Sequence, residues 1–502
     1  MTVVVGTEDL GGNVVAAPVT LAGTVVDDDL HADNDRRVKP LGQIFGSASA
    51  VPVTVRPTSD GERRWPKYHP SPHVSTVRRR QVDQGVDAVS VDGARRIEIL
   101  ETAARLFASS GLRTSLKEIA DASGILPGSL YHHFESKDAI IVELIERYRA
   151  DLDAIAEAAL DELREPGPEP VEGGIVALST EIAACAVRHR AAVLLTLYDP
   201  PSGSSDELLR AVRRTPMAVE KAMLETLRLG RERRYVRSGI DLETLAERFC
   251  QTMLYISLGV FQNAHEVARL ATIRCNILLH GVAVQPPRNA ELDRSNAFRR
   301  AQEIIASWGK AEDDDDERLT KVRAVARAEF GRKGYEATTV RDIAAAAGMA
   351  TGTVYRLIGS KDALLASIMR SFEVKVRSAW KAVLESESTA VEILDALMWV
   401  DINVVDRFSD EYNIRLAWLR ESPPRTLNLG QTYTARLRDL KTLLARGARS
   451  GQIHVQAPSA DMRAWSLFDL MWMHETIVHK VGARSALALA RDTVLRGAAR
   501  PS

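Results

Sequence analysis

The sequence predicts an all-α protein that carries one helical module twice. From residue 94 onward, apolar residues recur at the three- and four-residue spacing of amphipathic helices. Residues 124–139 and 348–363 share one pattern of glycines, a tyrosine and a final Ser-Lys-Asp-Ala. The repeat distance is far longer than the units of about 20–50 residues that build solenoids, so it indicates a duplicated domain.

The first copy reads as three short helical segments. Its first helix is predicted over residues 94–110 and ends at Gly111, as helices commonly do. Ser115 is predicted to cap a second helix, with Glu118 as its capping-box partner. Pro127 lies in the first turn of a third helix, where its missing N–H costs little.

The second copy repeats these elements. Its first helix has an apolar face formed by Val322, Ala326 and Phe330. Thr339 is predicted to cap a helix over residues 340–347, and Gly348 turns into a third helix. Two short helices joined by a Gly-containing turn are typical of a helix-turn-helix, whose second helix enters the major groove of DNA.

Both copies resemble the N-terminal DNA-binding domain of TetR/AcrR-family repressors. The shared pattern is a Phe and a Gly ending one helix, a Ser or Thr cap, Ile-Ala, a Gly turn, Gly-x-x-Tyr and Ser-Lys-Asp-Ala. It covers residues 94–145 and 317–370, and the remaining helices fit the family by class only. The resemblance implies two tandem modules, each with a helix-turn-helix domain and a C-terminal helical effector and dimerisation domain.

The resemblance also implies which residues contact DNA. In the first module they are Ser115, Leu126, Pro127, Gly128, Ser129, Tyr131, His132 and Lys137. In the second module they are Thr339, Ala350, Thr351, Gly352, Thr353, Tyr355, Arg356 and Lys361. The Tyr hydroxyls and the Lys side chains would hold phosphates, the capping hydroxyls could donate to phosphate as well, and the start of each third helix would lie against the bases. Phosphate contacts position such a module, and base contacts specify the sequence.

Several of these assignments have structural alternatives. Tyr131 could be a half-buried core residue, and Lys137 could be a solvated lysine at a helix start. Four apolar residues of the two third helices are expected in the core, namely Leu130, Phe134, Val354 and Ile358. Leu126 and Ala350 replace the usual hydroxyl cap of the third helix, a loss worth about 1 kcal/mol.

Composition limits the function classes. Lys and Arg number 66 against 67 Asp and Glu, so DNA contact must be local. Residues 78–80 are three arginines, whereas the acidic run at 312–317 predicts weaker DNA binding by the second half. The 3 cysteines form no CxxC pair, and the sequence predicts no metal site and no cofactor. Without an apolar run of membrane-spanning length or a signal-peptide pattern, a cytoplasmic protein is expected.

The predicted domain organisation has six parts. These are a disordered extension over 1–90, a first helix-turn-helix domain over 91–150, a first effector domain over 151–284, a linker with a helix over 285–316, a second helix-turn-helix domain over 317–372 and a second effector domain over 373–502. Because the chain holds two modules, we expect the helices of 241–282 to pack against those of 460–497 as an intramolecular pseudo-dimer. Pairing of like halves in a homodimer is the alternative.

The leading functional hypothesis is a DNA-binding transcriptional regulator, a repressor that a small-molecule effector releases from its operator. An effector pocket lined by aromatic residues is expected in the second half from Trp399, Trp418, Trp465 and Trp472. The alternative is a ligand-sensing or partner-binding protein in which one or both helix-turn-helix modules no longer bind DNA. An enzyme is not expected, because the sequence has no Gly-rich phosphate loop, nucleophile elbow or paired metal-ligand spacing.

Overall fold

The computed structural model describes most of the chain from residue 91 onward. The described residues are 91–110, 114–164, 170–196, 204–213, 217–259, 264–309, 316–335, 338–420 and 429–500. Within them the structure is helical and has no strands, only two isolated β-bridges. The predicted disordered extension over 1–90 and the arginines at 78–80 lie outside the described residues.

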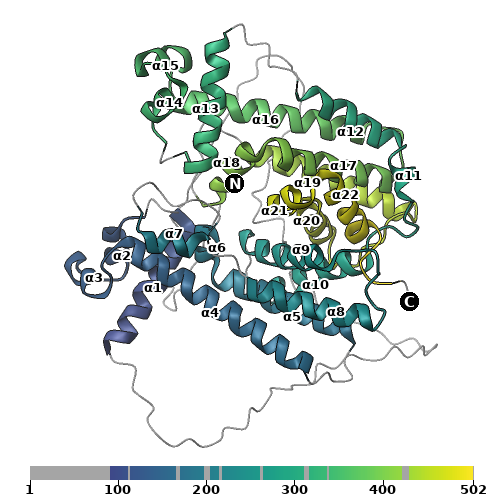
Figure 1. Cartoon of the computed structure of the whole chain (residues 1–502), viewed down its shortest axis with the longest axis horizontal. Helices are drawn as coiled ribbons and strands as arrows, with labels where there is room; N and C mark the ends of the chain where they lie inside the picture. The colour runs from purple at the N-terminus through teal and green to yellow at the C-terminus, as the bar shows by residue number, and fades with distance from the viewer. Residues whose placement is uncertain are drawn as a thin grey trace, which may run out of the picture. The chain divides into compact units, whose positions relative to one another are not determined.

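The helices of the first half, residues 91–284, begin with the DNA-binding module (Figure 1). They are α1 (Val91–Ser110), α2 (Leu116–Ala122), α3 (Pro127–His133), α4 (Lys137–Arg164), α5 (Val171–Arg188), α6 (Arg190–Thr196), α7 (Asp206–Arg213), α8 (Met217–Glu232), α9 (Leu242–Leu254), the 3₁₀ helix η3 (Tyr255–Leu258) and α10 (Ala264–His280). The sequence pattern did not predict α6, a helix of 7 residues in which all residues except the first and the last are buried.

The second half, residues 285–502, begins with two helices that precede its helix-turn-helix module. Its helices are α11 (Asn289–Leu292), α12 (Asn296–Ser307), α13 (Glu317–Lys333), α14 (Val340–Ala347), α15 (Thr351–Ile358), α16 (Lys361–Leu384), α17 (Ala390–Arg407), α18 (Ser409–Arg420), α19 (Leu429–Arg449), α20 (Ala460–Met471), α21 (Glu475–Val481), α22 (Ala483–Ala490) and the π-helical turn η4 (Arg491–Leu495). Residues 460–481 form two helices, α20 and α21.

Each DNA-binding module has a small core of its own. In the first, Phe107 of α1, Ile119 of α2 and Leu130 of α3 are fully buried. Phe330 and Val354 are their counterparts in the second module and are also fully buried. Phe134 and Ile358 are buried as well, which confirms the expected core positions of the two third helices.

One long helix leads from each DNA-binding module into the helical bundle that follows it. In the first half α4 packs against α5, α6, α7 and α8, and α5 packs in turn against α9 and α10. In the second half α16 and α17 pack against each other, and α12 packs against both. The segment expected as a linker thus supplies a core helix, since Phe298, Ala301 and Ile305 of α12 are buried.

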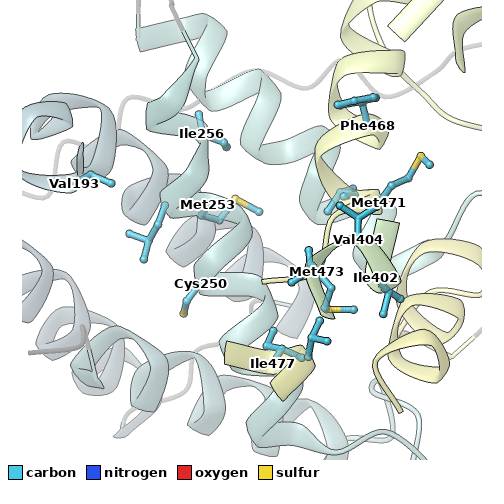
Figure 2. Close-up of a cluster of buried hydrophobic side chains, with 14 of the residues drawn as sticks. Val193, Cys250, Met253, Ile256, Ile402, Val404, Phe468, Met471, Met473 and Ile477 are labelled. Atoms are coloured by element: carbon cyan, nitrogen blue, oxygen red, sulfur yellow. The ribbon is translucent and has the colours of Figure 1, made fainter. Parts of the chain in front are cut away.

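The two halves pack against each other through their last helices. Helix α10 packs against α20 and η4, and α9 packs against α21. Figure 2 shows the apolar cluster at this contact, in which Met253 comes from the first half and Met471 and Met473 come from the second. The bridges Val236–Ala499 and Ala283–Ile453 join the same regions. The predicted packing of 241–282 against 460–497 is confirmed.

Buried arginines of the first half cross this contact, which we call the half-to-half interface. The Arg248 guanidinium donates to the Leu470 carbonyl at 2.8 Å and to the Thr493 hydroxyl at 3.2 Å. The Arg274 side chain is buried and forms an ion pair with Asp469. If the two halves moved apart or shifted, a buried arginine would lose its partner while still shielded from water, which is unfavourable. These contacts therefore favour one defined arrangement of the two halves.

Candidate nucleic-acid interface

The second helix of each module is fixed by a complete capping box. The Ser115 hydroxyl accepts from the Glu118 N–H at 3.2 Å, and the Glu118 carboxylate accepts from the Ser115 N–H. Thr339 and Asp342 form the same pair in α14. These hydrogen bonds lower the pKa of both carboxyls.

The capping geometry limits what the two hydroxyls can do for DNA. Ser115 Oγ also donates to the Glu118 carboxylate at 2.8 Å, and Thr339 Oγ1 donates to Asp342 at 2.8 Å. Each hydroxyl has a single proton to donate. A phosphate contact from Ser115 or Thr339 would therefore require this hydrogen bond to break.

The turn before each third helix uses left-handed backbone at a glycine. Gly124 has φ of +65° and Gly348 has φ of +68°, a region that favours glycine. The N-cap residues of α3 and α15, Leu126 and Ala350, form no side-chain capping bond, as the sequence predicted. The Leu126 side chain is 76% exposed, so it contributes little to the core and faces solvent at the start of α3.

The outer faces of α3 and α15 carry the predicted DNA-contacting residues. Tyr131 is 55% exposed and Tyr355 is 50% exposed, so each keeps about half of its surface in solvent, more than a half-buried core residue at position 131 was expected to keep. The other residues of this set are exposed or half-buried, namely Pro127, Gly128, Ser129, His132, Thr351, Gly352, Thr353 and Arg356. The structure therefore gathers the predicted set on one solvent-facing surface in each module, which we call the reading surface.

Two glycines on the reading surfaces have no packing role. A Cβ added at Gly128 or Gly352 would meet nothing within 4 Å. Neither residue has a positive φ, so the fold itself tolerates a larger side chain at both positions. Their small size leaves the backbone at the start of α3 and α15 open to a close approach by another molecule.

The two lysines at the starts of α4 and α16 have intramolecular partners. Lys137 Nζ donates to the Thr114 carbonyl at 3.3 Å, and burial lowers the pKa of this lysine. Lys361 Nζ donates to the Tyr335 and Thr338 carbonyls at 2.9 and 3.0 Å and lies 4.1 Å from the centre of the Tyr335 ring. Both lysines hold the loop before the second helix, and their contact with phosphate stays a prediction.

The tryptophans expected to line an effector pocket have separate surroundings. Trp399 is buried and stacks on Phe298, with ring centres 5.8 Å apart. Trp472 stacks on Tyr412 at 5.5 Å, and Trp465 is half-buried. The side chain of Trp418 lies outside the described residues. The described contacts therefore do not bring these rings into one pocket, and Trp399 belongs to the core.

A buried charge cluster in the second half was not predicted from the sequence. Glu373 of α16 lies 3.6 Å from Arg436 of α19 and 4.0 Å from Arg415 of α18. Asp401 of α17 accepts from Trp380 Nε1 at 3.0 Å, and burial raises the pKa of Asp401 to about 7. Buried ionisable groups of this kind occur at ligand sites and also in structural ion-pair networks. Only the packing of α16 to α19 brings them together.

The first half brings together three side chains that can bind a metal ion, although the sequence predicted no metal-ligand cluster. Asp151 of α4, Cys185 of α5 and His189 at the C-cap of α5 have ligand atoms within 4.8 Å of one another. The Cys185-x-x-x-His189 spacing on one helix was a signal available in the sequence. Asp151 could not be added to it without knowing how α4 packs on α5.

In the part of the chain that the structure describes, no helix is both long and apolar enough to cross a bilayer.

Comparisons with known proteins identify both modules. The family model described as "Bacterial regulatory proteins, tetR family" matches residues 99–144 and 322–368. The transcriptional repressor KstR2 of Mycobacterium tuberculosis is 32% identical over 166 residues, which are 33% of this chain and 80% of the relative. KstR2 of Rhodococcus jostii is 51% identical over 67 residues, which are 13% of this chain and 33% of that relative. The chain therefore spans about a third of the length of this relative.

Among solved structures, the ketosteroid transcriptional regulator KstR2 of Mycobacterium tuberculosis is 20% identical, with a TM-score of 0.30, over 36% of this chain and 97% of that chain. A single-module protein can cover only part of a chain that holds two modules. With the family model matched at both reading surfaces and a relative matched over most of its own length, the chain belongs to the tetR family of bacterial regulatory proteins and carries two modules of its type.

Proposed function

We propose that this chain is a ligand-responsive transcriptional repressor whose two modules read one operator as an intramolecular pseudo-dimer. The observation that carries this proposal is the half-to-half interface, in which the buried Arg274 of one half pairs with Asp469 of the other. The curated relatives are named transcriptional repressors, which supports repression as the direction of control.

DNA binding is supported by the two reading surfaces. Tyr131 and Tyr355 are exposed on the outer faces of α3 and α15, where a phosphate could accept a hydrogen bond from their hydroxyls. Gly128 and Gly352 leave room for a sugar-phosphate backbone beside α3 and α15. Arg356 adds a cation to the second reading surface, where it lies 3.5 Å from the Thr353 hydroxyl.

The residues of the half-to-half interface favour pairing of unlike halves over pairing of like halves. Asp469 and Gln251 lie at corresponding positions in α20 and α9, counted from the N-caps Ser459 and Asp241. In a homodimer of first halves, the buried Arg274 would therefore face Gln251 in place of a carboxylate. A buried arginine without its acid is costly, since breaking a buried pair costs about 3–5 kcal/mol.

A pseudo-dimer reads an operator whose two half-sites differ. Only the exact two-fold symmetry of a homodimer requires a palindrome. Here the starts of the two reading helices differ, with Leu126 and Ser129 in α3 against Ala350 and Thr353 in α15. Leu126 offers an apolar contact to a thymine methyl group, which Ala350 is too short to match.

Effector control is proposed to act through the long helices that leave the DNA-binding modules. Helix α16 carries Lys361 at the DNA-binding end and Glu373 in the buried charge cluster. A ligand that binds between α16, α17 and α19 would shift the population between conformations that can and cannot bind DNA. The second half is the proposed ligand-binding half, because it contains the buried charge cluster. In that cluster the Arg436 guanidinium lies 5.9 Å from the Trp380 ring centre, so a charged group and an aromatic ring are both available to a ligand.

A screen of lipophilic and acyl-type compounds is a suitable first test of the proposed effector control. Binding should change tryptophan fluorescence through Trp380 and should raise the unfolding temperature, since a ligand of the native state stabilises it by mass action. The same compound should release DNA. Compounds that raise the unfolding temperature of the wild type but leave DNA binding unchanged would contradict effector control.

The test of the DNA-binding proposal is selection of genomic fragments with the purified chain, followed by footprinting and light scattering. We expect one 55.2 kDa chain on one operator with unlike half-sites. A dimer of chains that protects two palindromic sites would overturn the pseudo-dimer.

The alternative is that one or both modules no longer bind DNA and the chain senses a ligand or a partner. The uncapped starts of α3 and α15 favour this alternative, because they weaken the helices that read DNA. A salt-dependent electrophoretic shift with the selected fragments separates the two functions. Failure of every fragment to shift at low salt would support the alternative.

A further inference from the structure

Helices α4 and α5 present a thiol, an imidazole and a carboxylate to one another in the first half. Asp151 Oδ2 and His189 Nε2 are 2.8 Å apart, and Cys185 Sγ lies with them inside a 4.8 Å cluster. Cys185 is completely buried, whereas Asp151 and His189 are partly exposed. The cluster therefore has a buried sulfur end and a solvent-facing end.

These three groups match the ligand set of a borderline-soft divalent cation. Zn²⁺ is bound by Cys sulfur at about 2.3 Å and by His nitrogen or carboxylate oxygen at about 2.0–2.2 Å. Ligand atoms around such a tetrahedral ion are about 3.3–3.8 Å apart, as these bond lengths dictate. The His189–Asp151 pair, at 2.8 Å, would have to open by about 0.5 Å, and the thiol, which lies within 4.8 Å of the other two ligand atoms, would have to approach by up to about 1.2 Å.

Helix geometry supports a shared site. Cys185 and His189 are four residues apart, and side chains at this spacing lie on one face of a helix, one turn apart. The His189 N–H closes the last turn of α5 by donating to the Cys185 carbonyl at 2.9 Å, which fixes the backbone of both ligands. The His189 ring also packs against Tyr148 of α4, with ring centres 5.8 Å apart.

We propose that Asp151, Cys185 and His189 bind one divalent cation of the Zn²⁺ type and so link the middle of α4 to the end of α5. Three protein ligands leave the fourth tetrahedral position to water. Arg188, whose guanidinium lies 3.4 Å from the Asp151 carboxylate, is exposed and can turn away when the cation replaces it.

A thiol–imidazole–carboxylate set could also act as a nucleophile with its base. The burial of Cys185 argues against that reading, because no substrate reaches a side chain without exposed surface. A metal ion reaches the sulfur through the exposed end of the cluster, where Asp151 and His189 lie.

The test is a titration of the full chain, without an affinity tag, with Co²⁺ as a spectroscopic substitute for Zn²⁺. We expect one Co²⁺ per chain with a thiolate-to-cobalt band in the near ultraviolet, displaced by Zn²⁺. Cys185→Ser should abolish the band, and His189→Ala should weaken binding more than about tenfold, the lower end of what loss of an outer-shell partner costs.

Two matched controls use features that the chain repeats elsewhere. Cys250 is a buried cysteine outside the cluster, and His280 forms a similar pair with Glu172 at 2.9 Å. Cys250→Ser and His280→Ala should leave the cobalt band unchanged.

A wild-type chain without the band would overturn the proposal, as would a band that survives in a folded Cys185→Ser variant. If Cys185→Ser fails to fold, His189→Ala decides, because its side chain is partly exposed. Retention of the wild-type band and affinity in His189→Ala would then overturn the site. The metal readout does not involve DNA, so its failure is distinct from failure of the proposed regulator function.

Discussion

At the scale of single residues, the exposed side chains of Tyr131 and Tyr355 are the main feature of the two reading surfaces. An exposed Tyr on a short helix adds little to the core, so its hydroxyl is available for recognition. The neighbouring lysines differ, because Lys137 and Lys361 already hold backbone carbonyls. Substituting a lysine would thus change both fold and DNA contact, whereas removing a tyrosine hydroxyl changes only the reading surface.

We predict that Tyr131→Phe with Tyr355→Phe weakens binding to all DNA sequences alike. Each lost hydroxyl–phosphate bond should cost about 1.5–3 kcal/mol, the range for hydrogen bonds to charged groups. The salt dependence should stay the same because no cation is removed. Fluorescence anisotropy with specific and random DNA measures both quantities, and unchanged affinity in both would refute the phosphate role.

Asp401 is the residue whose protonation should control stability. Its pKa is raised by burial from 3.8 to about 7, so between these values the folded chain holds a proton that the unfolded chain has lost. Stability from this group therefore falls as pH rises from about 4 to about 7 and is level above that window.

We predict that Asp401→Asn stabilises the protein increasingly across this window, by about 1.4 kcal/mol per pH unit at most. The Asn oxygen can still accept from Trp380 Nε1. Urea unfolding at several pH values measures the difference. Asp395→Asn is the comparison variant, because burial raises the pKa of Asp395 as well but its carboxylate pairs with the buried Arg491 at 2.8 Å, so its loss should destabilise the protein instead. A parallel pH dependence of Asp401→Asn and the wild type would contradict the assignment.

At the scale of elements, α3 and α15 are short helices that begin without a side-chain cap. Leu126 already has the extended backbone of an N-cap residue, with φ −71° and ψ 145°. Its side chain is exposed, so replacing it removes little buried apolar surface.

We therefore predict that Leu126→Ser stabilises the protein by about 0.5–2 kcal/mol through a new hydrogen bond to the N–H groups of the first turn. Chemical denaturation measures this gain, and Leu126→Ala should give none. The same serine should alter sequence preference at the first half-site, because the apolar contact is lost. Equal stability of the Ser and Ala variants would show that the start of α3 is not limited by its cap.

At the scale of the whole molecule, the half-to-half interface packs the two halves of the chain against each other. We predict that Arg274→Asp places a buried acid beside Asp469 and destabilises the chain by up to about 3 kcal/mol, the lower end for a buried ion pair, because Asp469 is itself 32% exposed. Asp469→Arg should do the same by placing two cations together.

The double variant, Arg274→Asp with Asp469→Arg, should recover most of the loss. Thermal unfolding measures the recovery, and light scattering shows whether the single variants separate into new assemblies. Additive losses in the double variant would mean that the two side chains do not interact, which would remove the main support for the pseudo-dimer.

The sequence by itself determined the local structure of this protein. The capping box of Ser115 and Glu118, the span of α14 over 340–347 and the core positions of Leu130 and Val354 follow from residues close together in the chain. Helix periods, caps and turns are local interactions, so one stretch of sequence is enough to predict them. The duplicated motif likewise identified the tetR-type modules.

Only the tertiary structure decided which distant residues meet. Asp151 joins Cys185 and His189 because α4 packs on α5, and Glu373 faces Arg436 because α16 packs near α19. The pairing of Arg274 with Asp469 depends on how two helical bundles fit together. Such contacts are set by side-chain packing between residues that are far apart in the sequence. The helical period shows which face of a helix is buried, but it does not show which helix packs against that face. The reading surfaces could therefore be predicted from the sequence, whereas the charge cluster, the metal-binding set and the half-to-half ion pairs could not.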